Sequence, residues 1–336
     1  MYKQLVLSCI FSLYTSYGIS QGTGACIQSV YPPLPQTAIR PGVSNATGYR
    51  IEDFGQGAYM VTEGAYQSLV LVSKTSIIVA DAPPTIGNKL VAAIRSLTYL
   101  LISHVVYSQH HADHIGGTSL LGSPPVVTFI SHRLTAGELA QVPGPHRRPA
   151  RNVVFDKPNH DPGNIFIYAP VQKVLMLVDV VFPGWVPFAY LGESQNIPGY
   201  IKAHDQILAY DFNHYIGGHL DRSGIRSDVL TQKEYVNDLY KNCAAAIALS
   251  ASPPNATNPI SAETLIPPVI ADNPGNSWAE FKIYLNTVAA YCANTINQKW
   301  LGRLGATDVF GFENAQAMIE ALRIDYDVLG PFGVQP

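Results

Sequence analysis

The sequence predicts a layered α/β domain followed by an α-helical extension, and three features indicate this. Between residues 50 and 221, short runs rich in Val, Ile and Tyr alternate with stretches of helical apolar spacing. From residue 227 onward the pattern changes to long helical stretches with little strand character. A cluster of histidines and carboxylates directly follows one apolar strand-like run, as in α/β proteins that carry their chemistry at strand ends.

Length and charge restrict the class of protein. The chain has 336 residues, 47% hydrophobic and 13% charged, which suits one large domain or one domain with an extension. The net charge is −3 and no large Lys/Arg cluster occurs, so no nucleic-acid partner is expected. The expected partner is a small-molecule substrate, and nothing in the sequence specifies an oligomeric state.

Residues 1–20 have the composition of a signal peptide. Lys3 precedes an apolar stretch, residues 5–13, and small residues follow at 18–20. The apolar stretch is shorter than the ~20 residues that a membrane span needs, and no later segment qualifies. We therefore expect no membrane span and a secreted, extracellular protein whose mature chain begins near Gln21. Sequons at Asn45 and Asn255 agree with a secreted glycoprotein.

Removal of such a leader leaves an odd number of cysteines. They are Cys26, Cys243 and Cys292, which predicts one disulfide and one free thiol. We expect the pair to be Cys243–Cys292, because both residues fall on predicted helices. None has C-x-x-C spacing, so a cysteine metal site is not expected.

The elements are expected in a regular order. Residues 21–49 hold four prolines among small polar residues and predict an extended arm. The domain expected at residues 50–226 then begins with strands 58–62, 66–72 and 76–80, helix 87–97, strand 100–107, helix 115–121, strand 125–131 and helix 132–141. A second β-rich block follows, with strands 152–155, 164–168 and 173–181, helix 198–209 and strand 212–216.

The extension, residues 227–336, is expected to contain helices 228–251, 277–301 and 313–324, with a proline-rich linker in its middle. One carboxylate, Asp179, falls inside an otherwise apolar predicted strand. A buried carboxylate is costly unless a metal or a hydrogen-bond network compensates for it.

The stretch with the most chemistry is Gln-His-His-Ala-Asp-His-Ile-Gly-Gly, residues 109–117. If it is extended, alternate side chains share a face, so Gln109, His111 and Asp113 point one way and His110 the other. His114 follows as the chain leaves the strand. Such nitrogen and carboxylate donors bind divalent metals, zinc first.

This stretch resembles the His-X-His-X-Asp-His motif of the metallo-β-lactamase superfamily. The match holds at His111, Asp113, His114 and both glycines, whereas Gln109 stands in place of the first histidine. A glutamine offers a neutral amide oxygen, a weaker donor than imidazole. The resemblance covers residues 50–222 and implies a four-layer αβ/βα sandwich.

The resemblance also implies the remaining ligands. His160 lies in Asn-His-Asp-Pro-Gly, which is similar to the family's Gly-His-Thr-Pro-Gly with Asp161 in place of threonine. Asp179 matches the aspartate that bridges two metals, and His219 matches the last ligand. Asp81 is either a helix cap or the acceptor that supports a ligand histidine.

Two metal positions are implied by this resemblance. The implied ligands are Gln109, His111 and His160 for the first metal, and Asp113, His114 and His219 for the second, with Asp179 bridging. We expect two Zn²⁺ per chain, with iron or manganese as alternatives. Asp113 is the expected catalytic residue, because its carboxylate can orient water or carry a proton to the leaving group.

The function predicted from these residues is a secreted metal-dependent hydrolase. It would use a metal-activated hydroxide on a small ester, lactone, thioester or β-lactam. One alternative is a mononuclear iron oxygenase of the persulfide-dioxygenase type. A second alternative is a non-catalytic binding protein on the same scaffold. The sequence names neither the substrate nor the metal.

Overall fold

The structure is a computed structural model that describes residues 31–39, 41–141, 151–153 and 160–332. Every helix and strand of the described residues belongs to the compact unit Leu34–Pro336. The predicted signal peptide, the start near Gln21 and Cys26 lie outside the described residues.

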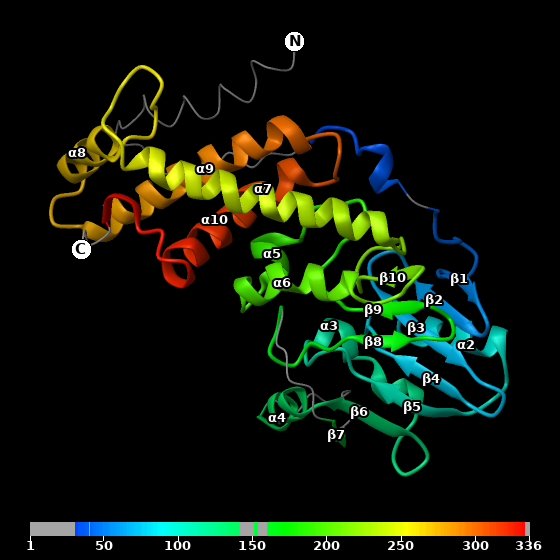
Figure 1. Ribbon diagram of the computed structural model, residues 1–336. Helices are drawn as coiled ribbons and strands as arrows, with labels where there is room; N and C mark the ends of the chain where they lie inside the picture. Colours follow the sequence, from blue (N-terminus) through cyan, green and yellow to red (C-terminus); the bar gives the residue numbers. More distant parts are fainter. Residues whose placement is uncertain (1–30, 40, 142–150, 154–159, 333–336) are drawn as a thin grey trace. The chain divides into compact units, whose positions relative to one another are not determined.

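The first sheet contains seven strands among the described residues, arranged in chain order from β1 to β7 (Figure 1). Neighbouring strands are antiparallel from β1 to β4 and parallel from β4 to β7. A parallel pair needs a crossover connection, which α2 (Asn88–Leu97) provides between β4 and β5. The strands are β1 (Arg50–Gly55), β2 (Ala58–Thr62), β3 (Gln67–Val72), β4 (Ile77–Ala80), β5 (Ile102–Val106), β6 (Thr128–His132) and β7 (Arg151–Val153).

The second sheet is smaller. Its described strands are β8 (Ile167–Ala169), β9 (Val174–Met176) and β10 (His214–Ile216), in the order β10-β9-β8. The predicted strand 173–181 is wrong in length, because the chain leaves the ladder after Met176 and turns. The strand expected at 152–155 is β7, which pairs with β6 and so belongs to the first sheet.

Period-two alternation gives the first sheet two apolar faces. One face carries Val61, Val70 and Val79, which pack with Leu90 and Ile94 of α2. The intervening residues of the same strands point to the other face. Both faces are therefore buried, and the sheet lies inside the fold.

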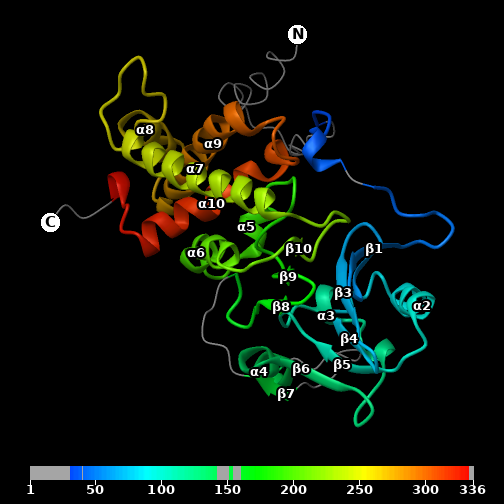
Figure 2. The same cartoon turned by 45° about the vertical axis from the view of Figure 1, so that its right-hand side comes forward.

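The second sheet and its helix complete the layering. Met60 and Leu69 of the first sheet pack with Val174 of the second, so the two sheets face each other. On its other side the second sheet places Tyr215 against Tyr200 of α6 (Ile197–Leu208). The order helix, sheet, sheet, helix is visible in Figure 2, where α2 and α6 lie on opposite sides of the sheets. The predicted four-layer αβ/βα sandwich is confirmed.

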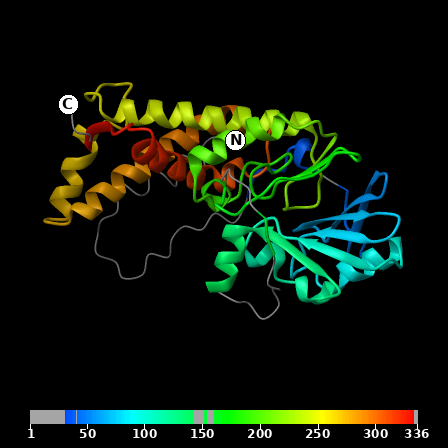
Figure 3. The same cartoon turned by 60° about the horizontal axis from the view of Figure 1, so that its bottom comes forward.

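The C-terminal helices lie side by side (Figure 3, yellow to red). They are α7 (Arg226–Ser250), α8 (Ala262–Asp272), α9 (Ser277–Trp300) and α10 (Thr307–Asp325). The predicted disulfide Cys243–Cys292 is present and joins α7 to α9. The predicted linker is partly wrong: α8 forms there despite two internal prolines, because Leu265 and Ile266 pack on the main core.

Shorter helical segments complete the described chain. They are η1 (Gln36–Ala38), α3 (Ala112–Ile115), η2 (Thr118–Leu121), α4 (Arg133–Gln141), α5 (Ala189–Glu193) and η3 (Gly330–Phe332). Across the described residues, no helix combines the length and apolarity needed to cross a bilayer. One hydrophobic core runs from the second sheet into α7, α9 and α10, and the domain boundary at residue 226 stays a prediction.

Candidate metal centre

The histidine-rich stretch is not extended. Strand β5 ends at Val106 and α3 begins at Ala112, so the chain turns within the motif. The expected alternation is therefore wrong for His110, whose ring lies beside that of His111 with centroids 4.5 Å apart. Both face Asp161: His110 Nδ1 lies 3.0 Å and His111 Nε2 3.8 Å from its Oδ2.

Side chains from three other segments of the chain meet at Asp179. It lies in the turn after β9, and its Oδ1 is 2.7 Å from His219 Nε2. Its Oδ2 is 3.2 Å from His114 Nε2 and 3.6 Å from His160 Nε2. The same oxygen accepts a hydrogen bond from the Gln109 amide. The structure thus brings together residues that the sequence places up to 110 positions apart, from Gln109 to His219.

Asp113 completes a second group on the open side. Its Oδ2 lies 3.6 Å from His114 Nε2 and 4.0 Å from His219 Nε2. Its side chain is 41% exposed, whereas that of His114 is fully buried. The carboxylate therefore stands where a substrate can reach it, above a buried imidazole.

The spacing of these donors suits a cation. The donor atoms of Asp113, His114 and His219 lie within 4.8 Å of one another, as do those of His111, His160 and Asp179. Two ligands at about 2.1 Å from a tetrahedral zinc are about 3.4 Å apart. The separations of 2.7–4.0 Å around Asp179 and Asp113 bracket that value.

Asp81 supports the buried histidine. At the end of β4, it accepts hydrogen bonds from Ser108 N at 2.9 Å and Ser108 Oγ at 2.6 Å. Its Oδ2 lies 3.7 Å from His114 Nδ1, so each ring nitrogen of His114 faces a carboxylate. Of the two roles predicted for Asp81, the structure supports that of acceptor, because helix α2 begins after Gly87 instead.

The charges of the site favour a cation. Burial opposes protonation of His114, but Asp179, Asp113 and Asp81 outweigh it and raise its pKa to about 9. Burial opposes ionisation of Asp179 as well, yet His114 and His219 hold its pKa well below the usual value. The carboxylates thus stabilise positive charge at this point, which a proton or a divalent metal can supply.

His160 is held in the form that binds metals. Burial lowers the pKa of its imidazole, although Asp179 opposes this, so the ring is neutral. Its backbone oxygen accepts hydrogen bonds from Gln195 N at 2.9 Å and from Ser194 Oγ at 3.3 Å. The segment after α5 therefore fixes the position of His160.

Gln109 has one buried side-chain atom without a hydrogen bond among the described residues. Its side chain is fully buried and its Nε2 donates to Asp179. Its Oε1 is buried and accepts no hydrogen bond from the described residues. A buried amide oxygen normally has a partner, so this atom fits a site that holds a metal or water.

Gly218 lets two ligand segments approach each other. It has φ +89°, and a Cβ there would lie 2.7 Å from Val178 Cβ and 2.9 Å from His114 Cε1. Only glycine accommodates that approach. As a result the ring of His219 lies 4.9 Å from that of His114.

One residue of the site carried no signal in the sequence. Tyr66, in the hairpin between β2 and β3, places its ring 4.7 Å from that of His219. Burial and the neighbouring Asp113, which accepts a hydrogen bond from the phenol, raise the pKa of Tyr66 to about 12. The phenol is therefore a permanent donor beside the exposed carboxylate at neutral pH. Nothing in the spacing of the sequence identifies it.

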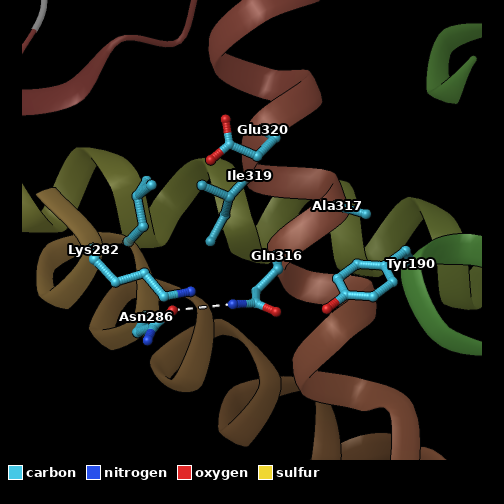
Figure 4. A pocket seen from close by; sticks show the side chains of 8 residues that line it. Tyr190, Lys282, Asn286, Gln316, Ala317, Ile319 and Glu320 are labelled. Atoms are coloured by element: carbon cyan, nitrogen blue, oxygen red, sulfur yellow. Dashed lines mark hydrogen bonds between the residues drawn. The ribbon is translucent and has the colours of Figure 1, made fainter. Parts of the chain in front are cut away.

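A pocket of about 250 Å³ lies elsewhere, between α9 and α10 (Figure 4). There Gln316 Nε2 donates to Asn286 Oδ1 at 3.0 Å. The carboxylate in its lining, Glu320, pairs with Arg323 at 2.9 Å. The lining of this pocket includes neither histidine nor aspartate.

Comparison with known proteins gives distant similarities. No protein-family model matches the sequence. The alpha subunit of 2,4-dinitroanisole O-demethylase from Nocardioides sp. (strain JS1661) is 24% identical over 220 residues, which make up 57% of this chain and 62% of that subunit. The chain thus spans less than two thirds of that relative's length.

Two solved structures illustrate the structural similarity. A metallo-β-lactamase from Pontibacter korlensis aligns over 56% of this chain and 99% of its own, at 15% identity and a TM-score of 0.48. The DIM-1 metallo-β-lactamase aligns over 56% and 97% of the two chains, at 19% identity and a TM-score of 0.47.

Proposed function

We propose that this chain is a metal-dependent hydrolase of the metallo-β-lactamase superfamily that holds two divalent cations, with zinc as the preferred metal. The observation that carries the proposal is the convergence of imidazole, amide and carboxylate donors on Asp179. The residues that would hold the cations are Gln109, His111 and His160 on one side and Asp113, His114 and His219 on the other, with Asp179 between them.

The residues around the cations have distinct tasks. When bound, zinc ions lower the pKa of water toward ~7 and polarise a carbonyl group. Asp113 accepts a proton and returns it to the leaving group, which its exposure permits. Asp81 holds the buried imidazole of His114 in place, and Gln109 does the same for Asp179. The phenol of Tyr66 donates to Asp113 and fixes its direction.

The substrate class we propose is a small ester, lactone, thioester or β-lactam. The curated relative is named as a subunit of an O-demethylase of 2,4-dinitroanisole, an aryl methyl ether. The panel of test substrates should therefore contain esters, lactones, thioesters and β-lactams, and also nitroaryl methyl ethers.

Metal analysis followed by this panel tests the proposal. Two zinc ions per chain, with hydrolysis lost on chelation and restored by zinc, are expected for a hydrolase. One iron per chain indicates the oxygenase alternative, and no metal indicates a binding protein.

Substitution of the exposed carboxylate tests the mechanism. Asp113→Ala should lower kcat by at least about 100-fold, the lower end of what general acid–base groups contribute, in a protein that remains folded by circular dichroism. The matched control is Asp211→Ala, an exposed aspartate that pairs with Lys173 and should leave turnover unchanged. Full hydrolysis by Asp113→Ala excludes the role given to this carboxylate.

We also propose that the protein is secreted and glycosylated. The asparagines of both sequons, Asn45 and Asn255, are exposed, as glycosylation requires. Expression in a eukaryotic host should deliver the protein to the medium, with a mass that falls on treatment with an N-glycosidase. Retention inside the cells opposes the proposal.

A further inference from the structure

A third group of donors lies beside the two proposed cation positions. His110, His111 and Asp161 offer donor atoms within 4.8 Å of one another. His111 also belongs to the group with His160 and Asp179. The chain thus presents two alternative positions for its first cation, and a single imidazole takes part in both.

Asp161 is fixed in one direction. Its side chain is 1% exposed, and its Oδ1 accepts a hydrogen bond from Gly163 N. Gly163 is confined in turn, because a Cβ there would lie 2.2 Å from Thr135 Oγ1. The other oxygen, Oδ2, faces His110 and His111 at 3.0 and 3.8 Å. These separations bracket the value of about 3.4 Å for two ligands of one tetrahedral zinc.

The alternative position has weaker donors. Gln109 is neutral, and its Nε2 donates to Asp179. The Asp179 oxygen that would serve the first cation, Oδ2, is also 3.2 Å from His114 Nε2. That oxygen is therefore shared among several groups, whereas Asp161 offers an oxygen that faces the two histidines of its own group. A charged carboxylate that serves one cation alone is the stronger ligand for zinc.

We propose that the first cation of this chain, a divalent metal such as zinc, is held by His110, His111 and Asp161. The inference rests on the proposed function, because it changes the ligands of one cation in the same pair. The two imidazoles are 25% and 28% exposed, so water and substrate can reach the remaining coordination position. Gln109 is then a positioning residue that holds Asp179 through its amide.

Counting bound metal in variants tests the assignment. Zinc per chain is measured by equilibrium dialysis and elemental analysis of the full chain, with circular dichroism to confirm folding. Wild type should bind two zinc ions, and His110→Ala and Asp161→Asn one each. Gln109→Ala should keep two. Asp113→Ala, which affects only the other position, should bind one.

Cobalt provides a second readout that does not depend on activity. The visible absorption of Co²⁺ reports the geometry and donors of each position, so His110→Ala should lose the bands of one ion and Gln109→Ala should keep them. If Asp161→Asn does not fold, His110→Gln replaces it in both measurements, because His110 is partly exposed and its substitution should be tolerated.

The outcomes separate the two proposals. Two zinc ions in both His110 variants overturn the inference and leave the hydrolase proposal in place. Loss of one ion in Gln109→Ala also overturns it, since this puts Gln109 among the ligands. A wild-type chain that binds no zinc overturns both.

Discussion

Acidification should destabilise this protein through one buried histidine outside the candidate metal centre. His204 lies on α6 and is fully buried, and its Nδ1 is 3.1 Å from the Tyr200 carbonyl and 3.3 Å from that of Ile201. Burial lowers the pKa of His204 from 6.5 to about 4, although these hydrogen bonds oppose the shift. The native protein therefore keeps this ring neutral where the unfolded chain protonates it.

The sign and size of the effect come from that difference. Between pH 6.5 and about 4 the unfolded state binds one more proton at this residue, so stability falls as the pH falls through that range. About 2.5 pH units at about 1.36 kcal/mol each amount to a loss of about 3 kcal/mol. Below about pH 4 both states are protonated, and this residue adds no further pH dependence.

Urea unfolding at several pH values measures the effect by difference. His204→Gln keeps an amide that can donate to the same carbonyls but has no titrating ring. Its stability relative to wild type should rise by about 3 kcal/mol as the pH is lowered from 7 to 4. The same substitution at His104, half-buried in β5, is the control. Parallel pH profiles for wild type and His204→Gln would refute the reasoning.

Two further predictions concern the backbone. Gly218→Ala should cost more than about 1 kcal/mol and weaken zinc binding, because its Cβ collides with Val178 at 2.7 Å. Gly137→Ala, with open space around it in α4, should be neutral or stabilising in the same assay. Replacing Cys243 and Cys292 by alanine opens a loop of 49 residues, which costs about 4 kcal/mol of unfolding free energy in the chain-entropy model. Equal stability of wild type and either destabilised variant contradicts the respective prediction.

Much of the candidate site could be predicted because the candidate ligands lie at strand ends. His219 follows β10, Asp179 follows β9 and the histidine-rich stretch follows β5. Strand ends are recognisable from apolar runs that stop at polar or glycine residues, and a layered fold brings such ends to one edge. The sequence thus predicted which residues meet, although it did not predict the turn that places Asp179.

The sequence-based prediction failed at His110 and at Tyr66, for two different reasons. Alternation excluded His110, because it assumed that the strand continues through the motif, whereas α3 begins at Ala112. A helix of four residues has too little periodicity to recognise in advance. Tyr66 was missed for a different reason. Its position beside Asp113 depends on the isolated bridge that pairs Tyr66 with His219, and no local pattern encodes that tertiary contact.

Asp179 also carries backbone strain that can be measured. Its φ is +62°, in the left-handed region that costs a residue with a side chain roughly 1–2 kcal/mol. Two variants separate the carboxylate from the backbone, since Asp179→Ala and Asp179→Gly remove the same carboxylate but only glycine relaxes the strain. Both should lose zinc, and Asp179→Gly should be more stable than Asp179→Ala by about 1 kcal/mol in urea unfolding. If the two variants have the same free energy of unfolding, the turn after β9 is not strained, and Asp179 adopts this backbone conformation at no cost.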